Sequence, residues 1–399
     1  MKHPGYVGLI SLISLLAFGH VQAAETWEFV LTVPPQERSL EVPITYPLPA
    51  PLAAKGTKDK NWQIREGERT IAAQLADGAP PAIVFMLPLA QSRSEVTRRL
   101  RLESTRGPSG SPFQLKEAEG KYLHLTDGGV PVLTYNFGMI LKPGVAENRC
   151  RSSYVHPVYT PNGTLITDDF PADHLHHRGL SWMWPNVEVG GGRHSLWEIR
   201  GIRQRFERWL DRNGGPVFAR LAVENGWYVE DNKVAREVVT LLVYRSSPQG
   251  RAIDVTLEFE ALASPVTLTG ELKERKGYGG LCFRFAPRKD TVITTPSGVQ
   301  AKDTNMVPSP WADLSAHFGE GAQWSGAAVF DDARNPGFPN GWTLREYGFL
   351  GVAWPGMRPA TIEPGRPLVL RYRLWLHGGN ADDASVTAAY SAYANPPRL

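Results

Sequence analysis

The sequence predicts an all-β protein, a large antiparallel β-sandwich preceded by a small N-terminal β domain. Ile253, Val255, Leu257 and Phe259 alternate with mostly polar neighbours, and residues 368–376 repeat the pattern less strictly. A period of two is typical of strands with one buried face. The 39 glycines and 33 prolines supply the turns that many short strands require. A length of 399 residues exceeds one ordinary core and predicts two domains.

The first residues have the three parts of a secretory signal peptide. Lys2 and His3 give a basic start, residues 6–18 are apolar but too few to span a bilayer, and Ala23 and Ala24 offer small side chains for cleavage. We therefore expect residues 1–24 to be removed and the mature protein to be periplasmic or secreted. No later stretch is long and apolar enough to predict a membrane span.

Turn-forming residues divide the mature chain into two regions. Alternating runs at residues 27–33 and 95–102 predict a small N-terminal β-sandwich domain over residues 25–105. Residues 106–112 are rich in glycine, proline and serine, which predicts a linker. Residues 113–399 are then expected to form the large sandwich, because the strand patterns resume directly after this linker.

The net charge and the number of cysteines limit which partners and which cysteine chemistry we expect. A formal charge of +3 is nearly balanced, so we expect no nucleic-acid partner. Only Cys150 and Cys282 are present, far apart in the sequence. In an oxidising compartment they could form a disulfide, and two buried thiols are the equal alternative. No CxxC spacing is present to indicate a structural zinc site.

The densest group of proton-transferring side chains lies between residues 168 and 184. Histidine titrates nearest to neutrality, so imidazoles beside carboxylates indicate general acid/base catalysis or metal ligation. Indoles downstream offer flat faces for a sugar ring. The alternative is a polar loop whose histidines bond the backbone. The group comprises Asp168, Asp169, Asp173, His174, His176, His177, Arg178, Trp182 and Trp184.

A regular strand through this group would separate its histidines. His174 and His176 would then share a face with Arg178, while His177 would lie on the opposite face. His156 precedes a proline, which favours an extended backbone, and could approach from a neighbouring strand. We therefore predict that His156 forms the acid/base pair with His176 or His177; the alternative is that His156 bonds a turn carbonyl.

Further side chains are candidates for binding a substrate. Arg284 and Arg345 are predicted to clamp anions or hydroxyls, although Arg284 could equally lie on a solvated sheet face. Glu198 is the best isolated carboxylate for a general acid, with a plain surface role as the alternative. Large aromatic side chains either stack on a sugar or fill the core. The aromatic candidates are Trp182, Trp184 and Trp342.

Several motifs together resemble a known protein family. Residues 135–136, 154–157 and above all 173–179, which read Asp-His-Leu-His-His-Arg-Gly, are similar to the core of the family DUF6807, often labelled PmoA-like or methane oxygenase. The likeness covers residues 120–379. It departs at Leu175, where the family has proline, and at residues 337–338, where a more basic pair is usual.

The resemblance implies a fold and a biological setting. It implies a β-supersandwich similar to galactose mutarotase, in an exported protein of bacteria that degrade complex carbohydrates. It does not bring a reaction with it, because fold alone does not determine activity. The methane oxygenase label conflicts with the sequence, since particulate methane oxygenase subunits are embedded in the membrane and the mature chain offers no spanning segment.

Three classes of function fit these residues. The first is an enzyme, a lyase, hydrolase or epimerase, that uses histidine acid/base chemistry on a sugar or oligosaccharide and needs no cofactor. The second is an enzyme with a divalent metal at the histidine cluster, and the third is a non-catalytic glycan-binding protein. The predicted catalytic residues are His156, His176, His177, Arg178 and Asp173. The predicted substrate contacts are Trp182, Trp184, Arg284, Asn335, Trp342 and Arg345.

Overall fold

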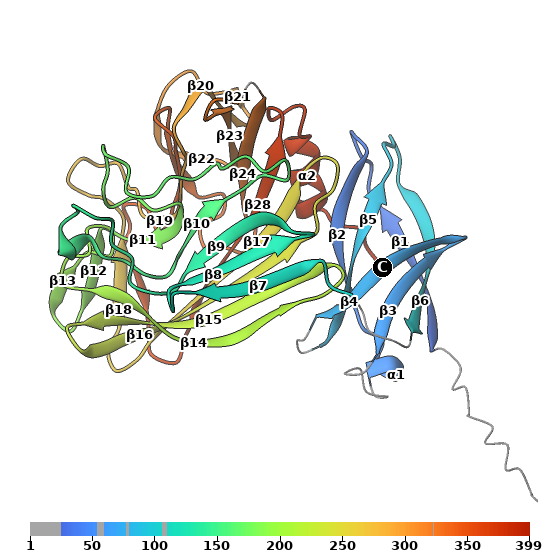
Figure 1. Ribbon diagram of the computed structural model, residues 1–399, viewed down its shortest axis with the longest axis horizontal. Helices are drawn as coiled ribbons and strands as arrows, with labels where there is room; N and C mark the ends of the chain where they lie inside the picture. The colour runs from blue at the N-terminus through green and yellow to red at the C-terminus, as the bar shows by residue number, and fades with distance from the viewer. Residues whose placement is uncertain (1–24, 54–59, 77–79, 106–109, 322) are drawn as a thin grey trace, which may run out of the picture.

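The computed structural model describes residues 25–53, 60–76, 80–105, 110–321 and 323–399 (Figure 1). Strands account for 58% of the chain and helices for 4%, which confirms the predicted all-β class. The paired strands are antiparallel throughout this part of the chain, for example at the long pairings β15–β16 and β17–β28. The expected signal peptide, residues 1–24, and residues 106–109 of the expected linker lie outside the described residues.

The small N-terminal region contains one sheet of six strands. The two runs that predicted strands pair with each other, as β1 and β6. The ring of Phe29 lies 4.0 Å from that of Tyr46, which brings the two edge strands of the sheet together and folds the sheet over on itself. In sheet order the strands are β1 (Thr26–Val33), β6 (Val96–Thr105), β3 (Asn61–Glu66), β4 (Arg69–Ala76), β5 (Ala82–Leu89) and β2 (Leu40–Pro47).

The body is built mainly from two nine-stranded sheets. The first has the order β22 (Thr304–Pro308), β25 (Gly341–Arg345), β26 (Phe349–Ala353), β19 (Gly280–Arg284), β11 (Leu180–Met183), β10 (Tyr154–Val158), β9 (Val130–Asn136), β8 (Tyr122–Asp127), β7 (Phe113–Ala118). The second has the order β14 (Arg203–Gly214), β15 (Phe218–Val229), β16 (Asn232–Tyr244), β17 (Arg251–Ala261), β28 (Leu368–Gly378), β24 (Trp324–Asp331), β23 (Trp311–Phe318), β20 (Arg288–Thr295), β21 (Gly298–Val299). A smaller sheet follows the order β13 (Gly192–His194), β12 (Asn186–Val189), β18 (Val266–Thr269), β27 (Ala360–Ile362).

The main core lies between the two large sheets. Ile253 on β17 pairs with Leu374 on β28, so the two alternating runs that predicted the fold are neighbours in one sheet. Both belong to a hydrophobic cluster that also contains Leu123 of β8 and Phe283 of β19. One cluster therefore joins the inner faces of both sheets, which is the arrangement of a sandwich.

The small region shares a second core with the body. Leu31 and Phe85 pack in one cluster with Trp311 and Trp375 of the second large sheet. The chain end returns to the small region, where Arg398 forms a backbone bridge with Thr32 on β1 (Figure 1). The six-stranded sheet is therefore packed onto the body through a shared hydrophobic cluster, and the division into two domains stays a prediction.

A buried carboxylate lies inside the main sandwich. Glu237 on β16 is fully buried. It accepts hydrogen bonds from Trp227 Nε1 at 2.7 Å, Gln204 Nε2 at 2.8 Å and Asn225 Nδ2 at 2.8 Å. A buried polar group costs stability unless it is hydrogen-bonded, so these three donors account for the place of a glutamate in the core.

Replacing Glu237 by glutamine should lower the free energy of unfolding by about 1–3 kcal/mol, because one buried donor loses its acceptor. Urea unfolding monitored by circular dichroism measures this change. Glu258→Gln is the matched control, since Glu258 lies on the neighbouring strand β17 with its side chain 39% exposed. Equal stabilities of the two variants would contradict a role for Glu237 in the core.

The two cysteines are free in the structure. Cys282 is buried on β19, and burial raises the pKa of its thiol. Cys150 is half-buried, and burial again raises the pKa of its thiol. Thiols with raised pKa values are poor nucleophiles. The alternative of two buried thiols therefore holds for Cys282, whereas Cys150 is only half-buried.

Candidate functional site

The histidine segment forms two consecutive turns and not a strand. The His174 amide donates to the Pro171 carbonyl at 3.1 Å, and the His177 amide donates to the His174 carbonyl at 2.8 Å. The prediction that His177 points away from His174 and His176 is therefore wrong. The turns instead gather all three imidazoles, with ring centroids 4.6–5.7 Å apart.

Two of these imidazoles belong to a stack of four rings. His174 and His177 are nearly parallel, with centroids 4.7 Å apart and planes inclined by 6°. Tyr347 covers the outer side of His174 at 5.0 Å, and Phe349 on β26 stacks on His177 at 4.9 Å. The hairpin between β25 and β26 therefore supports the histidine turns from a distant part of the sequence.

Arg178 holds the turns in place from behind. Its guanidinium is fully buried and donates to the carbonyl oxygens of Leu175 at 2.5 Å, His177 at 2.7 Å and Arg149 at 2.8 Å. Its Nε lies 3.2 Å from Asp169 Oδ1. With no exposed surface, Arg178 positions the loop and does not contact a substrate, which corrects its predicted catalytic role.

The histidines line a small cavity of about 280 Å³. Its walls combine imidazoles, carboxylates and phenols contributed by the histidine turns, the β25–β26 hairpin and the segments around Glu198 and Tyr278. We call it the small cavity. It is lined by His174, His176, His177, Trp197, Glu198, Glu274, Lys276, Tyr278, Thr343, Arg345, Tyr347 and Phe349.

The first acid–histidine pair is Asp173 with His174, of which His174 lines the cavity. Asp173 Oδ2 lies 2.9 Å from His174 Nδ1, within ion-pair distance but outside good hydrogen-bond geometry. Both Asp173 oxygens accept hydrogen bonds from Arg284 Nη2 on β19, at 2.7 and 2.9 Å. Partial burial raises the pKa of Asp173, but the contacts with His174 and Arg284 outweigh it and lower the pKa. Asp173 is therefore an ionised group that orients His174.

The second pair is Glu198 with His176. His176 Nδ1 lies 3.5 Å from Glu198 Oε1, and Arg149 Nη1 donates to Glu198 Oε2 at 2.5 Å. Partial burial raises the pKa of Glu198, but Arg149 and His176 outweigh it, so the net pKa is lowered. Glu198 is therefore a carboxylate at neutral pH, and with its side chain 43% exposed it fits the alternative of a surface role.

Two of the imidazoles at the cavity, those of His176 and His177, are held neutral by lowered pKa values. Burial lowers the pKa of His176 to about 4, although Glu198 acts in the opposite direction. Burial and the neighbouring imidazoles also lower the pKa of His177. Conversely, burial raises the pKa of Tyr278 and of Tyr347 to about 12. At neutral pH the cavity thus offers an imidazole able to accept a proton and phenols able to donate one.

His156 is placed away from the small cavity. It lies on β10, where its Nδ1 is 3.0 Å from Thr167 Oγ1, and it lines none of the cavity wall. Burial lowers its pKa to about 4. The predicted pairing of His156 with His176 or His177 is therefore not found.

The tryptophans predicted as sugar platforms lie in the core. Trp182, Trp184 and Trp342 are each 0% exposed, so none can offer a face to a ligand. A sandwich of two large sheets has a deep interior, which these indoles fill. Asn335 is also structural, because its side chain bonds Asp331 and the backbone of Arg371. These four substrate-binding predictions are wrong.

Arg284 and Arg345, the two arginines predicted to clamp a substrate, each line a cavity, and the guanidinium of each also bonds other residues of the protein. Arg345 lines the small cavity, and its guanidinium donates to the Thr304 carbonyl at 2.7 Å and to Asn305 Oδ1 at 2.5 Å. Arg284 lies over the ring of Tyr347 at 4.9 Å and bonds Asp173. Both arginines therefore fix the walls, and Arg284 supports the acid–histidine pair.

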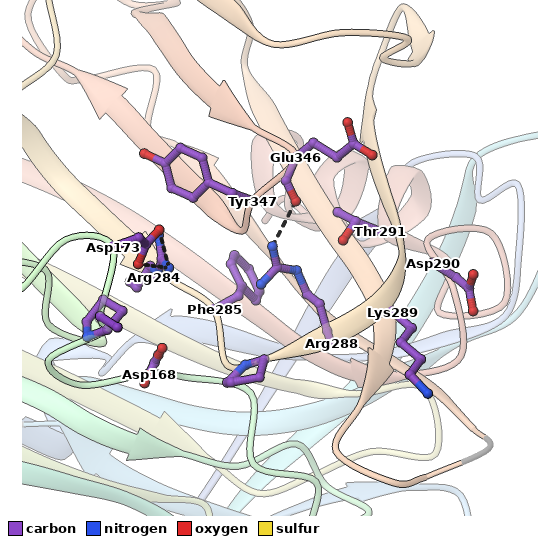
Figure 2. Close-up of a pocket in the computed structure, with 13 residues that line it drawn as sticks. Asp168, Asp173, Arg284, Phe285, Arg288, Lys289, Asp290, Thr291, Glu346 and Tyr347 are labelled. Carbon is purple, nitrogen blue, oxygen red and sulfur yellow. Dashed lines mark hydrogen bonds and ion pairs between the residues drawn. The ribbon is translucent and has the colours of Figure 1, made fainter.

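A second, larger cavity of about 920 Å³ lies next to Arg284 and Tyr347 (Figure 2). Asp173 and Tyr347 form one end of it. We call it the large cavity. It is lined by Asp168, Pro171, Ala172, Asp173, Arg284, Phe285, Pro287, Arg288, Lys289, Asp290, Thr291, Glu346 and Tyr347.

Sequence reasoning missed several residues of the site. Tyr278, Tyr347, Phe349 and Trp197 were not predicted to contact a ligand, yet all line the small cavity. Trp197 carried one local signal, since it adjoins Glu198. The others are far downstream of the histidines, so only the strand order of the first large sheet brings them near.

The hypothesis of a divalent metal at the histidine cluster depends on how the candidate ligands are arranged. In the described part of the chain, no three His, Cys, Asp or Glu side chains are grouped closely enough to hold a metal ion. The nearly parallel stacking of His174 and His177 also directs their nitrogen lone pairs along parallel planes. Two ligands of one ion need converging lone pairs, so this pair does not fit a common metal.

Acidification should destabilise the protein. The pKa of His156 and of His176 is lowered to about 4 in the folded state, against an ordinary 6.5 when unfolded. The unfolded state therefore binds protons first as pH falls below 6.5, so this stability is present above pH 6.5 and lost toward pH 4. Each histidine should cost roughly 2 kcal/mol between pH 7.5 and 5.

Urea unfolding at both pH values measures the loss. His156→Asn removes one titrating group while keeping a polar atom for Thr167, and should reduce the loss by about a third, because burial also lowers the pKa of His176 and His177. His124→Gln is the control, because His124 is an exposed residue on β8. A stability that does not change between these pH values would contradict the burial of neutral imidazoles.

The fold and the site together define an all-β protein whose two-sheet sandwich carries an imidazole-rich cavity. The chain belongs to DUF6807, described as a family of unknown function, whose profile matches residues 122–391. That range includes every residue of the small cavity. No curated protein matches the chain. Within the residues that the structure describes, no helix is long and apolar enough to cross a membrane.

Proposed function

We propose that this protein is an exported enzyme that acts on a carbohydrate by acid/base chemistry in the small cavity. One observation carries the proposal: His174, His176, His177 and Glu198 line one cavity, where Glu198 pairs with His176, and Asp173 pairs with His174 from just outside it. Titratable groups with perturbed pKa values that converge on a cavity are typical of catalytic sites. A scaffold similar to galactose mutarotase, which the family resemblance implies, would suit a sugar substrate.

Three residues of the small cavity are assigned to proton transfer, one as the base and two as proton donors. His176 is neutral at physiological pH and oriented by Glu198, so it is the proposed base that removes a proton from a sugar hydroxyl or ring carbon. Tyr278 and Tyr347 keep their protons and are the proposed donors to the leaving oxygen or the opposite face. Proton removal and return of this kind serve a lyase, an epimerase or a hydrolase.

Recognition of the sugar is assigned to the accessible aromatic side chains. Tyr347 is 38% exposed and Tyr278 is half-buried, so their rings can contact the apolar face of a sugar. Trp197 and Phe349 are almost fully buried and support the wall from behind. This arrangement replaces the tryptophan platforms expected from the sequence.

A glycan panel tests the proposal. The protein is incubated with neutral and acidic oligosaccharides, products are separated by chromatography, and binding is measured by calorimetry. The expected result is a product from at least one glycan, which is lost in His176→Gln. Binding without product would support the non-catalytic alternative, and neither binding nor product would refute a carbohydrate function.

Metal removal separates acid/base from metal-dependent chemistry. Because His174 and His177 stack in parallel, we expect less than stoichiometric metal after dialysis and an unchanged melting temperature with a chelator. A metal bound only by the folded state would raise the melting temperature by mass action. One tightly held zinc, manganese or iron per chain in elemental analysis would favour the metal-dependent alternative.

A further inference from the structure

The large cavity has Asp173 and Tyr347 in its lining, and Tyr347 also lines the small cavity (Figure 2). We propose that it is a second sugar subsite, so that the substrate is an uncharged oligosaccharide of at least two residues with its reacting ring in the small cavity. This inference rests on the proposed function. It adds the size and the charge of the substrate.

The two cavities have lining residues in common or in contact. Tyr347 lines both of them. Asp173 lines the large cavity, while His174, its neighbour in the sequence and its ion-pair partner, lines the small one. The two cavities therefore meet at Tyr347 and at the Asp173–His174 pair, and there we place the glycosidic bond between the two sugar rings.

The large cavity has a direction. Figure 2 shows Asp173, Arg284 and Tyr347 at one end and Lys289 and Asp290 at the other. A chain that starts at the histidines would therefore extend along the beginning of β20, toward Thr291. At about 920 Å³, the space is more than three times that of the small cavity, which leaves room for more than one further ring.

The charges of the lining favour a neutral ligand. Three cationic side chains face four carboxyl groups in the large cavity. Arg284 is already paired with Asp173, and Asp290 lies 3.0 Å from His317 Nδ1. An acidic sugar would require an excess of positive charge. Mixed donors and acceptors instead suit hydroxyls, which both donate and accept hydrogen bonds.

Chain length tests the inference. The probes are glucan, mannan, galactan and xylan oligosaccharides of one to four residues, with oligogalacturonates as the acidic series. For the series that is turned over, kcat/KM of the trisaccharide should exceed that of the monosaccharide by at least about tenfold, because contacts remote from the reacting ring are used in the transition state.

A substitution in the large cavity tests whether the dependence on chain length arises there. Thr291→Trp places a bulky side chain in the large cavity and should bring the trisaccharide-to-monosaccharide ratio close to one. Val299→Trp, at an exposed position on β21, should keep the ratio of the parent protein. A ratio near one in the parent protein, an unchanged ratio in Thr291→Trp, or turnover confined to oligogalacturonates would overturn this inference and leave the proposed function standing. Absence of any binding or turnover would remove both.

Discussion

Replacing His176 by glutamine should lower kcat by about 10²–10⁴ on any glycan that the protein turns over, because removing a general base typically costs that much. Glutamine keeps a polar group near Glu198 but cannot accept and return a proton at neutral pH. Affinity should change much less than kcat, since the stacking surfaces at Tyr278 and Tyr347 remain. Steady-state kinetics on the active glycan measures both.

The control for this variant is His124→Gln, which removes an exposed imidazole on β8. Both variants should unfold at urea concentrations close to that of the parent protein, so that a loss of activity cannot be attributed to unfolding. A His176→Gln variant that retains full kcat would show that the base lies elsewhere, and the proposed roles in the small cavity would have to be withdrawn.

Replacing Arg178 by methionine should lower the free energy of unfolding by about 3–5 kcal/mol. Three carbonyl oxygens lose their donor, and Asp169 loses the buried cation beside it. Burial already raises the pKa of Asp169 to about 6, against the effect of Arg178, so this carboxyl should become protonated at neutral pH in the variant. Urea unfolding at pH 7.5 measures the change.

Arg193→Met provides the comparison, because Arg193 pairs with Glu188 at 3.0 Å with its side chain 85% exposed. Exposed ion pairs contribute about 1 kcal/mol or less. Arg178→Lys is informative as well, since lysine keeps the charge but not the planar fork that reaches three carbonyls. If Arg178→Met were no less stable than Arg193→Met, the loop would not depend on this guanidinium.

The class of fold was predictable because strand patterning is local. A strand with one buried face repeats every two residues, and the runs around Ile253 and Leu374 show that repeat in the sequence alone. Their pairing as neighbouring strands was not predictable, since 121 residues separate the two partners of that register. The same limit applies to the shared core between the six-stranded sheet and the body.

The position of the histidine cluster in the chain was predictable from its residue types, but the directions of its side chains were not. Its density of titratable groups identified the correct segment, whereas the assumed strand gave the wrong faces. Pro171 and the three aspartates at residues 168–173 are turn-forming, and they account for turns in place of a strand. Trp182 lies within the buried strand β11 and Trp184 directly follows it, which places both in the core.

The most direct test of the account is a crystal structure of His176→Gln with an oligosaccharide that the parent protein turns over. The account predicts a sugar ring in the small cavity, in contact with Tyr278 and Tyr347 and within hydrogen-bond reach of residue 176. A sugar bound only elsewhere, for example on the six-stranded N-terminal sheet, with the small cavity empty at saturating ligand, would contradict it.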